Sequence, residues 1–265
     1  MSDATAVSCR AFVTISVDDG HPTDLRTAEL LHKHGIKATF YAPATNPERP
    51  VMSPNDLRRL SSSFEVGGHT LNHVSLPSLS RERAWSEIVD CKNWLEDLTG
   101  KTVTSFCYPK GKFDRVTAGL AKKAGFLAAR TCLFNLHDFP ADPFRWGVST
   151  HACSHSHLVQ MRHALLEGNF AGAWNYWSVY KGTTVWQEQF LRALDHVSEH
   201  GGIAHLGMHS WEIDAYGHWG ILDSVFKSIA ERRSLIKVTN GTLFEMSTAN
   251  GVVPIQAGSV FTAAD

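Results

Sequence analysis

The stretch Ala11-Phe-Val-Thr-Ile-Ser-Val17, which runs into Asp18-Asp19-Gly20, sets the architecture of this chain. Its apolar and β-branched residues predict a strand buried inside a sheet. The Asp-Asp-Gly that follows is good turn chemistry and predicts a carboxylate-bearing loop at the carboxyl end of the strand. A helix over 23–34, closed by Gly35, and a second strand over 37–42 are expected next. The chain therefore opens with a strand–helix–strand unit of the parallel type.

The same alternation continues along the rest of the chain. Helices are expected after Ser53, from Ser80 to Gly100, over 114–124 and over 221–229. Strands are expected over 64–68, 104–108, 126–131, 144–149, 203–208 and 236–239. This spacing suits βα units and a parallel sheet, and seven or eight strands suffice for a closed or nearly closed (β/α) barrel. The least regular stretch, 151–186, is expected to be an insertion or a lid.

The composition narrows the class of protein. The 265 residues include 25 Lys and Arg against 26 Asp and Glu, and a formal net charge of −1 gives no overall attraction for nucleic acid or an anionic membrane. Five scattered cysteines without a Cys-x-x-Cys pair argue against a zinc ribbon or a disulfide framework. Residues 1–5 lack the features of an export signal, and no apolar run approaches the ~18–20 residues that span a bilayer. We expect a cytoplasmic protein.

Polar side chains follow several of the predicted strands. Asp18 and Asp19 follow the first, His69 and His73 the third, 108–111 the fourth and His209 the seventh. In a (β/α) barrel the carboxyl ends of the strands form the mouth in which active sites lie. The chain also has 15 histidines, which directs attention to metal binding and proton transfer.

The spacing of His69 and His73 allows both to converge on one metal ion if the turn between them is helical. Alone, the pair would be two surface histidines on a loop. A carboxylate from another strand end changes this interpretation, because two histidines and one aspartate leave positions open on a divalent ion. A metal would also separate the roles of Asp18 and Asp19, one binding the ion and the other acting as a base. Without it, the two aspartates are a cap and a turn.

Four motifs together resemble the polysaccharide deacetylases, that is, carbohydrate esterase family 4 or the NodB-homology proteins. They are Val17-Asp18-Asp19-Gly20, His69-Thr-Leu-Asn-His73, Tyr108-Pro109-Lys110-Gly111, and the strand 203–208 ending in His209. The resemblance runs from about Phe12 to Phe244 and implies that residues 1–265 form a single catalytic domain, a distorted (β/α) barrel of seven or eight strands. It implies hydrolysis of N-acetyl groups on amino sugars, with these roles: Asp18 as catalytic base, Asp19, His69 and His73 as metal ligands, and His209 as catalytic acid.

Two of the family's motifs are altered in this chain. The third usually reads Arg-Pro-Pro-Tyr-Gly, and Cys107 stands where the arginine that orients the base would be. Arg130 or Arg145, both near predicted strand ends, is expected to take its place. The fourth motif, Asp-x-x-Asp-Trp, has become Asp142-Pro-Phe-Arg145-Trp146. These changes predict a divergent subgroup with a different substrate.

We therefore expect a metal-dependent hydrolase that removes an N-acetyl group from an amino sugar or a glycan intermediate. A small non-sugar amide or a formamide is an alternative substrate, and a non-catalytic carbohydrate-binding relative is an alternative class. Zn is the first choice of metal, and Co, Ni and Mn fit the same ligands. We expect no nucleic-acid partner and no transmembrane segment, and the oligomeric state is open.

The substrate side of the site is expected to involve Tyr108, Lys110 and Trp211. A backbone N–H near Lys110 would hold the oxyanion of the reaction. Trp211 would stack on a sugar face or form an apolar pocket for the acetyl methyl, with plain packing as the alternative. To act as an acid, His209 needs a nearby carboxylate that raises its pKa, and Glu212 and Asp214 are the candidates.

Overall fold

The computed structural model describes residues 10–249, which build an eight-stranded sheet whose strand pairs are all parallel. The strand order is β5-β4-β3-β2-β1-β7-β6, and β8 pairs with β1 as well. The strands are β1 (Ala11–Val17), β2 (Thr39–Ala42), β3 (Glu65–Gly68), β4 (Ser105–Cys107), β5 (Ala128–Arg130), β6 (Thr150–His151), β7 (Gly202–Met208) and β8 (Ile236–Lys237). This arrangement is the distorted (β/α) barrel that the sequence predicts.

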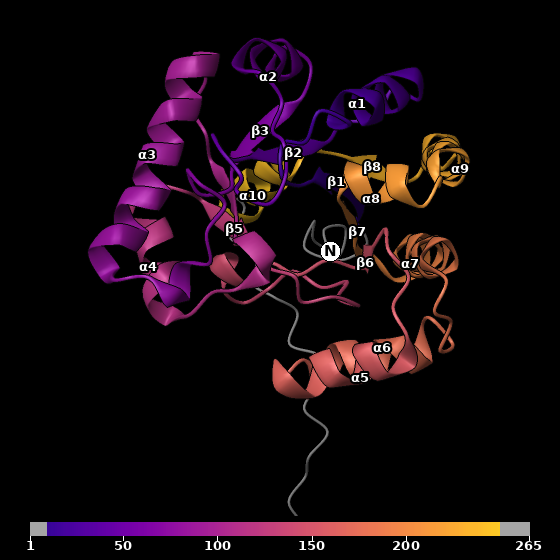
Figure 1. Cartoon of the computed structure of the whole chain (residues 1–265). Coiled ribbons are helices and arrows are strands. Elements are labelled where there is room, and N and C mark those ends of the chain that lie inside the picture. Colours follow the sequence, from indigo (N-terminus) through magenta and orange to yellow (C-terminus); the bar gives the residue numbers. More distant parts are fainter. Residues whose placement is uncertain (1–9, 250–265) are drawn as a thin grey trace, which may run out of the picture.

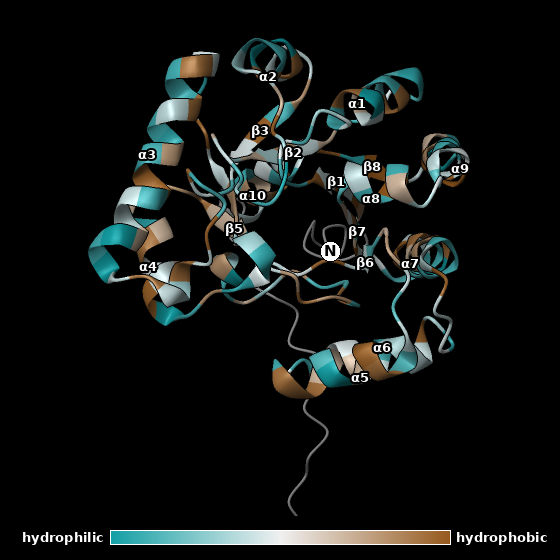
Figure 2. Cartoon of the chain, viewed as in Figure 1, coloured by the Kyte–Doolittle hydropathy of each residue, from teal (hydrophilic) through white to brown (hydrophobic). Residues whose placement is uncertain are grey.

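Helices surround the strands in a ring, as Figure 1 shows. The α-helices are α1 (Asp24–Lys33), α2 (Pro54–Ser61), α3 (Arg81–Thr99), α4 (Arg115–Lys123), α5 (His157–Leu166), α6 (Phe170–Ser178), α7 (Trp186–His200), α8 (Ser210–Ala215), α9 (Trp219–Glu231) and α10 (Asn240–Ala249). Short 3₁₀ turns are η2 (Leu76–Ser78), η3 (Pro109–Gly111) and η4 (Pro143–Arg145). In Figure 2 the ring helices carry both apolar and polar residues, as expected for helices with one face packed on a sheet.

The first strand lies at the centre of the core. All seven residues of β1 are buried, and β1 pairs with β7 along its whole length, from Ala11↔Gly202 to Val17↔Met208. Ile15 and Val17 belong to a large apolar cluster that also takes in the inner faces of the surrounding helices. Apolar residues at 11, 13, 15 and 17 alternate with Phe12, Thr14 and Ser16, and both sets are buried because the strand is covered on both sides.

The predicted helix starts are confirmed. The side chains of Ser53 and Ser80 accept hydrogen bonds from backbone N–H groups in the first turns of α2 and α3. Gly100 ends α3 in the left-handed conformation, with φ of 67°. Local chemistry at the ends of these helices therefore sets their boundaries.

The strand predicted over 144–149 is wrong. Pro143 begins the 3₁₀ turn η4, whose start is capped by the Asp142 side chain, and the strand β6 comes only at 150–151. Proline lacks the N–H that a strand would need. The backbone N–H groups of the residues that follow donate to three separate partners, the carbonyls of Ala129, Leu133 and a residue of β7. A single bridge, Arg130↔Trp146, joins this segment to β5.

The irregular stretch 151–186 contains two helices that the sequence did not indicate. The helices α5 and α6 pack against each other and lie at the outer edge of the ring in Figure 1. The helix α10 was also not predicted. No helix within residues 10–249 is both long enough and apolar enough to cross a membrane.

Candidate active site

Strand pairing brings Asp18 and His209 side by side. Val17 and Met208 are register partners, and the N–H of Asp18 donates to the carbonyl of Met208 at 2.9 Å, so the next residue of each strand leaves the sheet at the same place. The distance from His209 Nε2 to Asp18 Oδ2 is 4.0 Å, and it is also 4.0 Å to Asp19 Oδ2.

Three buried side chains converge next to this pair. Asp19, His69 and His73 offer ligand atoms that all lie within 4.8 Å of one another. Asp19 Oδ1 lies 3.0 Å from His73 Nε2 and 3.5 Å from His69 Nε2. Burial raises the pKa of Asp19, but hydrogen bonds from His69 and His73 outweigh burial and hold the pKa well below its usual range. The three residues therefore present two imidazole nitrogens and a carboxylate to one point.

The turn that carries the two histidines is not helical. Thr70 and His73 have φ of 59° and 52°, and Asp19 has φ of 78° in the facing loop. Non-glycine residues in the left-handed region cost free energy and persist where the surroundings force them, often at functional sites. The Thr70 hydroxyl accepts the N–H of Val74 at 3.0 Å, which stabilises the turn.

A neighbouring strand orients His69. Gly68 and Phe106 are register partners, which sets His69 beside Cys107, and His69 Nδ1 lies 2.8 Å from the Cys107 carbonyl oxygen. A carbonyl can only accept, so Nδ1 donates to Cys107, and Nε2 is turned toward Asp19. This second hydrogen bond is typical of histidines that bind metals. The donor set and its orientation fit a divalent cation.

Arg130, one of the two arginines expected to replace the motif arginine, pairs with Asp18. Cys107 and Arg130 are register partners on β4 and β5, and the fully buried guanidinium of Arg130 donates to Asp18 Oδ2. Burial raises the pKa of Asp18, but the positive charges of Arg130, His69 and His209 outweigh burial and lower it. Asp18 Oδ1 has no hydrogen-bond partner among the described residues.

Arg145 does not contribute. It is exposed and its guanidinium lies 5.8 Å from the ring centroid of Phe113, away from Asp18. The Cys107 thiol lies 3.9 Å from Asp18 Oδ2, and burial raises the pKa of Cys107 well above its usual value. The thiol is therefore a neutral neighbour of Asp18.

Glu212 is the carboxylate partner of His209. His209 Nδ1 lies 2.8 Å from Glu212 Oε2. Burial lowers the pKa of His209, but the hydrogen bond to Glu212 and the charges of Asp18 and Asp19 raise it to about 9. Asp214, the other candidate, accepts the indole N–H of Trp219 instead.

The three residues expected on the substrate side lie in different surroundings. Tyr108 is buried, and its hydroxyl donates to the carbonyl of Phe144, so its side chain does not face the other site residues. Lys110 is at the rim in an ion pair with Glu48. The indole N–H of Trp211 donates to Asp19 Oδ2 at 2.9 Å, which links Trp211 to the candidate metal ligands.

The structure adds residues that the sequence reasoning missed. His151 ends β6 near the site, and burial together with the charges of Arg130 and His209 lowers the pKa of His151. Its position at a strand end was a signal that could have found it. The guanidinium of Arg49 lies 3.3 Å from the ring centroid of Trp211. Arg49 sits in a loop with no motif, so only the structure could place it.

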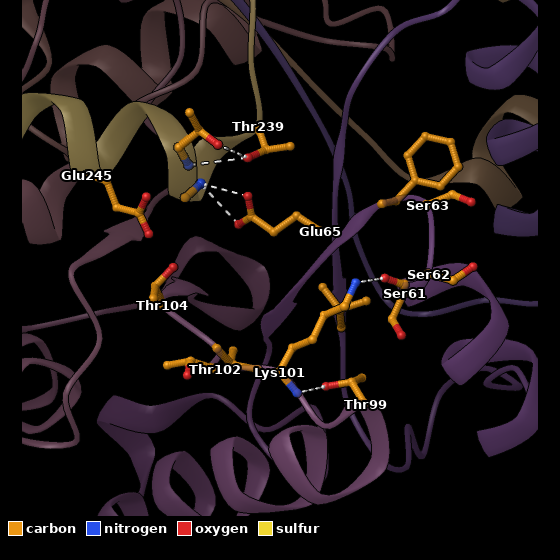
Figure 3. Close-up of a pocket in the computed structure, with 15 residues that line it drawn as sticks. Ser61, Ser62, Ser63, Glu65, Thr99, Lys101, Thr102, Thr104, Thr239 and Glu245 are labelled. Atoms are coloured by element: carbon orange, nitrogen blue, oxygen red, sulfur yellow. Dashed lines mark hydrogen bonds between the residues drawn. The ribbon is translucent and has the colours of Figure 1, made fainter.

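A cavity lies where β3 begins, at the end of the strand opposite to His69. Figure 3 shows its lining residues. The cavity has a volume of about 390 Å³ and is lined mostly by hydroxyl side chains, Lys101, Glu65 and Glu245. Glu65 is the first residue of β3, and its carboxylate accepts the N–H of Gly241 in the first turn of α10. The cavity contains none of the site residues described above, and its central carboxylate serves as a link between β3 and α10.

Comparisons with known proteins agree with this arrangement. A family profile described as polysaccharide deacetylase matches residues 7–129. Over 140 residues the chain is 29% identical to a peptidoglycan-N-acetylglucosamine deacetylase of Bacillus cereus, covering 52% of this chain and 63% of that protein. The chain spans less than two thirds of the length of the curated relatives it matches first.

Solved structures share the fold at low sequence identity. A Mycobacterium smegmatis structure described as a polysaccharide deacetylase superposes with a TM-score of 0.64 at 13% identity, covering 97% of this chain and 96% of that one. A family 4 acetyl xylan esterase from Clostridium thermocellum, solved with a cobalt ion, gives a TM-score of 0.56 at 18% identity, with 91% and 93% coverage. The profile match, the curated relatives and the shared fold together support a divergent member of the polysaccharide deacetylase family.

Proposed function

We propose that the protein is a metal-dependent hydrolase that removes an N-acetyl group from an amino sugar or a glycan intermediate. The observation that carries this proposal is the buried pair of Asp18 and Arg130, which lies directly beside the cluster of Asp19, His69 and His73 and opposite His209. Because these residues come from β1, β3, β5 and β7, we propose that residues 12–244 act as one catalytic unit.

The candidate metal ligands are Asp19, His69 and His73. Their buried positions and the outward-turned Nε2 of His69 suit a divalent ion, with Zn as first choice and Co, Ni or Mn as alternatives. When bound, such an ion supplies positive charge that polarises an amide carbonyl and acidifies water.

Asp18 is the proposed general base. Arg130 holds one carboxylate oxygen and keeps Asp18 ionised, while Oδ1 is free to accept a proton from water. As the proton moves to Asp18, the water oxygen bonds to the amide carbonyl carbon. Arg130 therefore acts through Asp18 as a positioning residue.

His209 is the proposed general acid. Glu212 accepts the Nδ1 proton, which turns Nε2–H toward the space beside Asp18 and Asp19. When the C–N bond breaks, the proton from Nε2 moves to the leaving nitrogen, so a neutral amine is released together with acetic acid, which keeps the second water proton and ionises in solution. Transfer of the proton held by Asp18 back to His209 restores both groups. This proton is necessary because an amine anion is a very poor leaving group.

A substrate panel tests the proposed activity. The purified chain is incubated with N-acetylglucosamine oligomers, N-acetylated sugar phosphates, N-formyl sugars and small non-sugar amides, with added Zn²⁺ or with a chelator. Mass spectrometry should show loss of acetyl from the sugars with Zn²⁺, no loss with chelator, and recovery on adding the ion back. Reaction of the small amides or formamides alone would move the substrate away from N-acetyl sugars, and absence of any reaction would favour a non-catalytic relative.

A further inference from the structure

The loop between β2 and α2, residues 43–53, connects the loops that follow four other strands. Its backbone and side chains contact the segments after β1, β3, β4 and β7 through these pairs: Met52 N–H to Gly20 O, Ala44 and Thr45 N–H to Leu71 O, Glu48 to Lys110, and Arg49 to Trp211. Anchors on both sides of the site fix the position of this loop. The two charged side chains at its tip are therefore held at the rim of the mouth.

Arg49 is fixed next to the candidate metal ligands without an acidic partner. Its guanidinium stacks on the Trp211 ring, and the same ring donates its N–H to Asp19. Stacking uses the flat face of a guanidinium and leaves its in-plane N–H donors available. Glu48 is already paired with Lys110, and no carboxylate in residues 10–249 lies within ion-pair distance of Arg49.

His21 lies in the segment that the Arg49 loop contacts. The N–H of Met52 donates to the carbonyl of Gly20 at 2.7 Å, which sets this loop beside Gly20 and the adjoining His21. His21 Nδ1 lies 2.7 Å from the Thr23 hydroxyl. That hydroxyl lies 2.6 Å from the Ser210 hydroxyl, which donates to Asp24, so hydrogen bonds fix the position of the imidazole.

Arg49 is therefore placed beside the loop that carries Asp18 and Asp19. The Met52–Gly20 bond joins the two loops, and the Trp211 ring lies between the Arg49 guanidinium and the Asp19 carboxylate. The guanidinium lies one indole ring away from Asp19.

We propose that Arg49 forms an oxyanion-binding subsite, so that the preferred substrate carries a carboxylate or phosphate group close to its acylated nitrogen. This inference rests on the proposed function for the identity of the substrate, but the subsite itself can be tested by binding alone. A guanidinium with free in-plane donors matches the two oxygens of a carboxylate or phosphate. A neutral sugar would leave these donors without a charged partner.

The test is isothermal titration calorimetry of the Zn²⁺-loaded protein with three sugars that have a free amine and cannot be deacetylated. Glucosamine is the reference without an anionic group, glucosamine 1-phosphate carries a phosphate on the carbon next to the amine-bearing one, and muramic acid carries a carboxylate on its other side. At least one anionic sugar should bind about tenfold more tightly than glucosamine, the ratio for ~1.4 kcal/mol of charge-assisted hydrogen bonding. Whichever anionic sugar binds more tightly shows whether the subsite prefers a phosphate or a carboxylate.

Variants of the arginines give the matched comparison. Arg49→Gln should abolish the preference, and Arg49→Lys should restore only part of it, because lysine keeps the charge but lacks the planar fork. Arg145→Gln, which removes another exposed arginine that lies over an aromatic ring, should leave the preference unchanged.

Equal binding of the three sugars, or no measurable binding of any, would overturn the proposal, as would an unchanged preference in Arg49→Gln. A preference that persists in a protein without deacetylase activity would keep the subsite and refute the proposed function instead.

Discussion

At the scale of single residues, a neighbouring strand compensates for a lost side chain. Cys107 cannot orient Asp18, but its register partner Arg130 reaches the same carboxylate from β5. The sequence offered Arg130 and Arg145 as equal candidates, because the choice depends on register and on the 3₁₀ turn that carries Arg145. Arg49 was invisible for a similar reason, since its partner Trp211 is distant in the chain.

Removing the Arg130 charge should destabilise the fold strongly. Arg130→Met leaves the Asp18 carboxylate buried without its partner, which should lower the free energy of unfolding by about 3–5 kcal/mol. Urea denaturation measures this. The double variant Asp18→Asn/Arg130→Met should recover much of the loss, because no unpaired charge is left. A single variant as stable as the unmodified protein would contradict the pairing.

His209→Ala should affect amides more than activated esters. An aryl acetate has a phenolate leaving group that needs no proton, whereas an amide needs one from the acid. We expect kcat on an N-acetyl sugar to fall by about 10²-fold or more, with a much smaller loss on the ester. Glu212→Gln should show the same pattern more weakly, because it removes the partner of Nδ1. Equal losses on both substrates would leave His209 a positioning role only.

At the scale of elements, local chemistry was readable and long-range pairing was not. Caps such as Ser80 act within one turn, so the sequence located the ends of α3 and the position of β1. The segment 144–149 was misread because its backbone N–H groups hydrogen-bond to three different parts of the chain rather than to one neighbouring strand. The candidate site could be predicted as strand-end clusters, but not its geometry, because register decides which of those ends meet.

The cap of α3 gives an element-scale prediction. Ser80→Ala removes the side chain that accepts the Arg83 N–H at 3.2 Å and should lower the free energy of unfolding by about 1 kcal/mol. Ser63→Ala, at an exposed serine, is the matched control and should change it by less than about 0.5 kcal/mol. Thermal or urea unfolding distinguishes the two, and equal effects would argue against the cap.

At the scale of the whole molecule, buried neutral histidines make stability depend on pH. Burial lowers the pKa of both His137 and His205 to about 3. In the unfolded chain each should bind a proton near pH 6.5, so the unfolded state holds more protons below that value and stability is lost as pH falls. Between about pH 7 and pH 5 each histidine should remove about 2 kcal/mol.

His205→Gln tests this linkage. The variant should lose less stability over the same pH interval than the unmodified protein, measured by urea denaturation with chelator present. His32→Gln, which changes an exposed histidine, should leave the pH dependence as it was. A His205→Gln variant with an unaltered pH dependence would mean that His205 is protonated in the folded protein.

In the proposed mechanism the cluster of Asp19, His69 and His73 binds the metal while Asp18 and His209 perform the proton transfers. The most direct test measures Zn²⁺ content by elemental analysis and acetate release from the N-acetyl sugar turned over fastest, for the unmodified protein, Asp18→Asn and His69→Ala. We predict that Asp18→Asn retains the metal and loses turnover, and that His69→Ala loses both, because we propose His69 as a ligand and Asp18 as the base. Substantial turnover by Asp18→Asn, or full metal content in His69→Ala, would contradict the account.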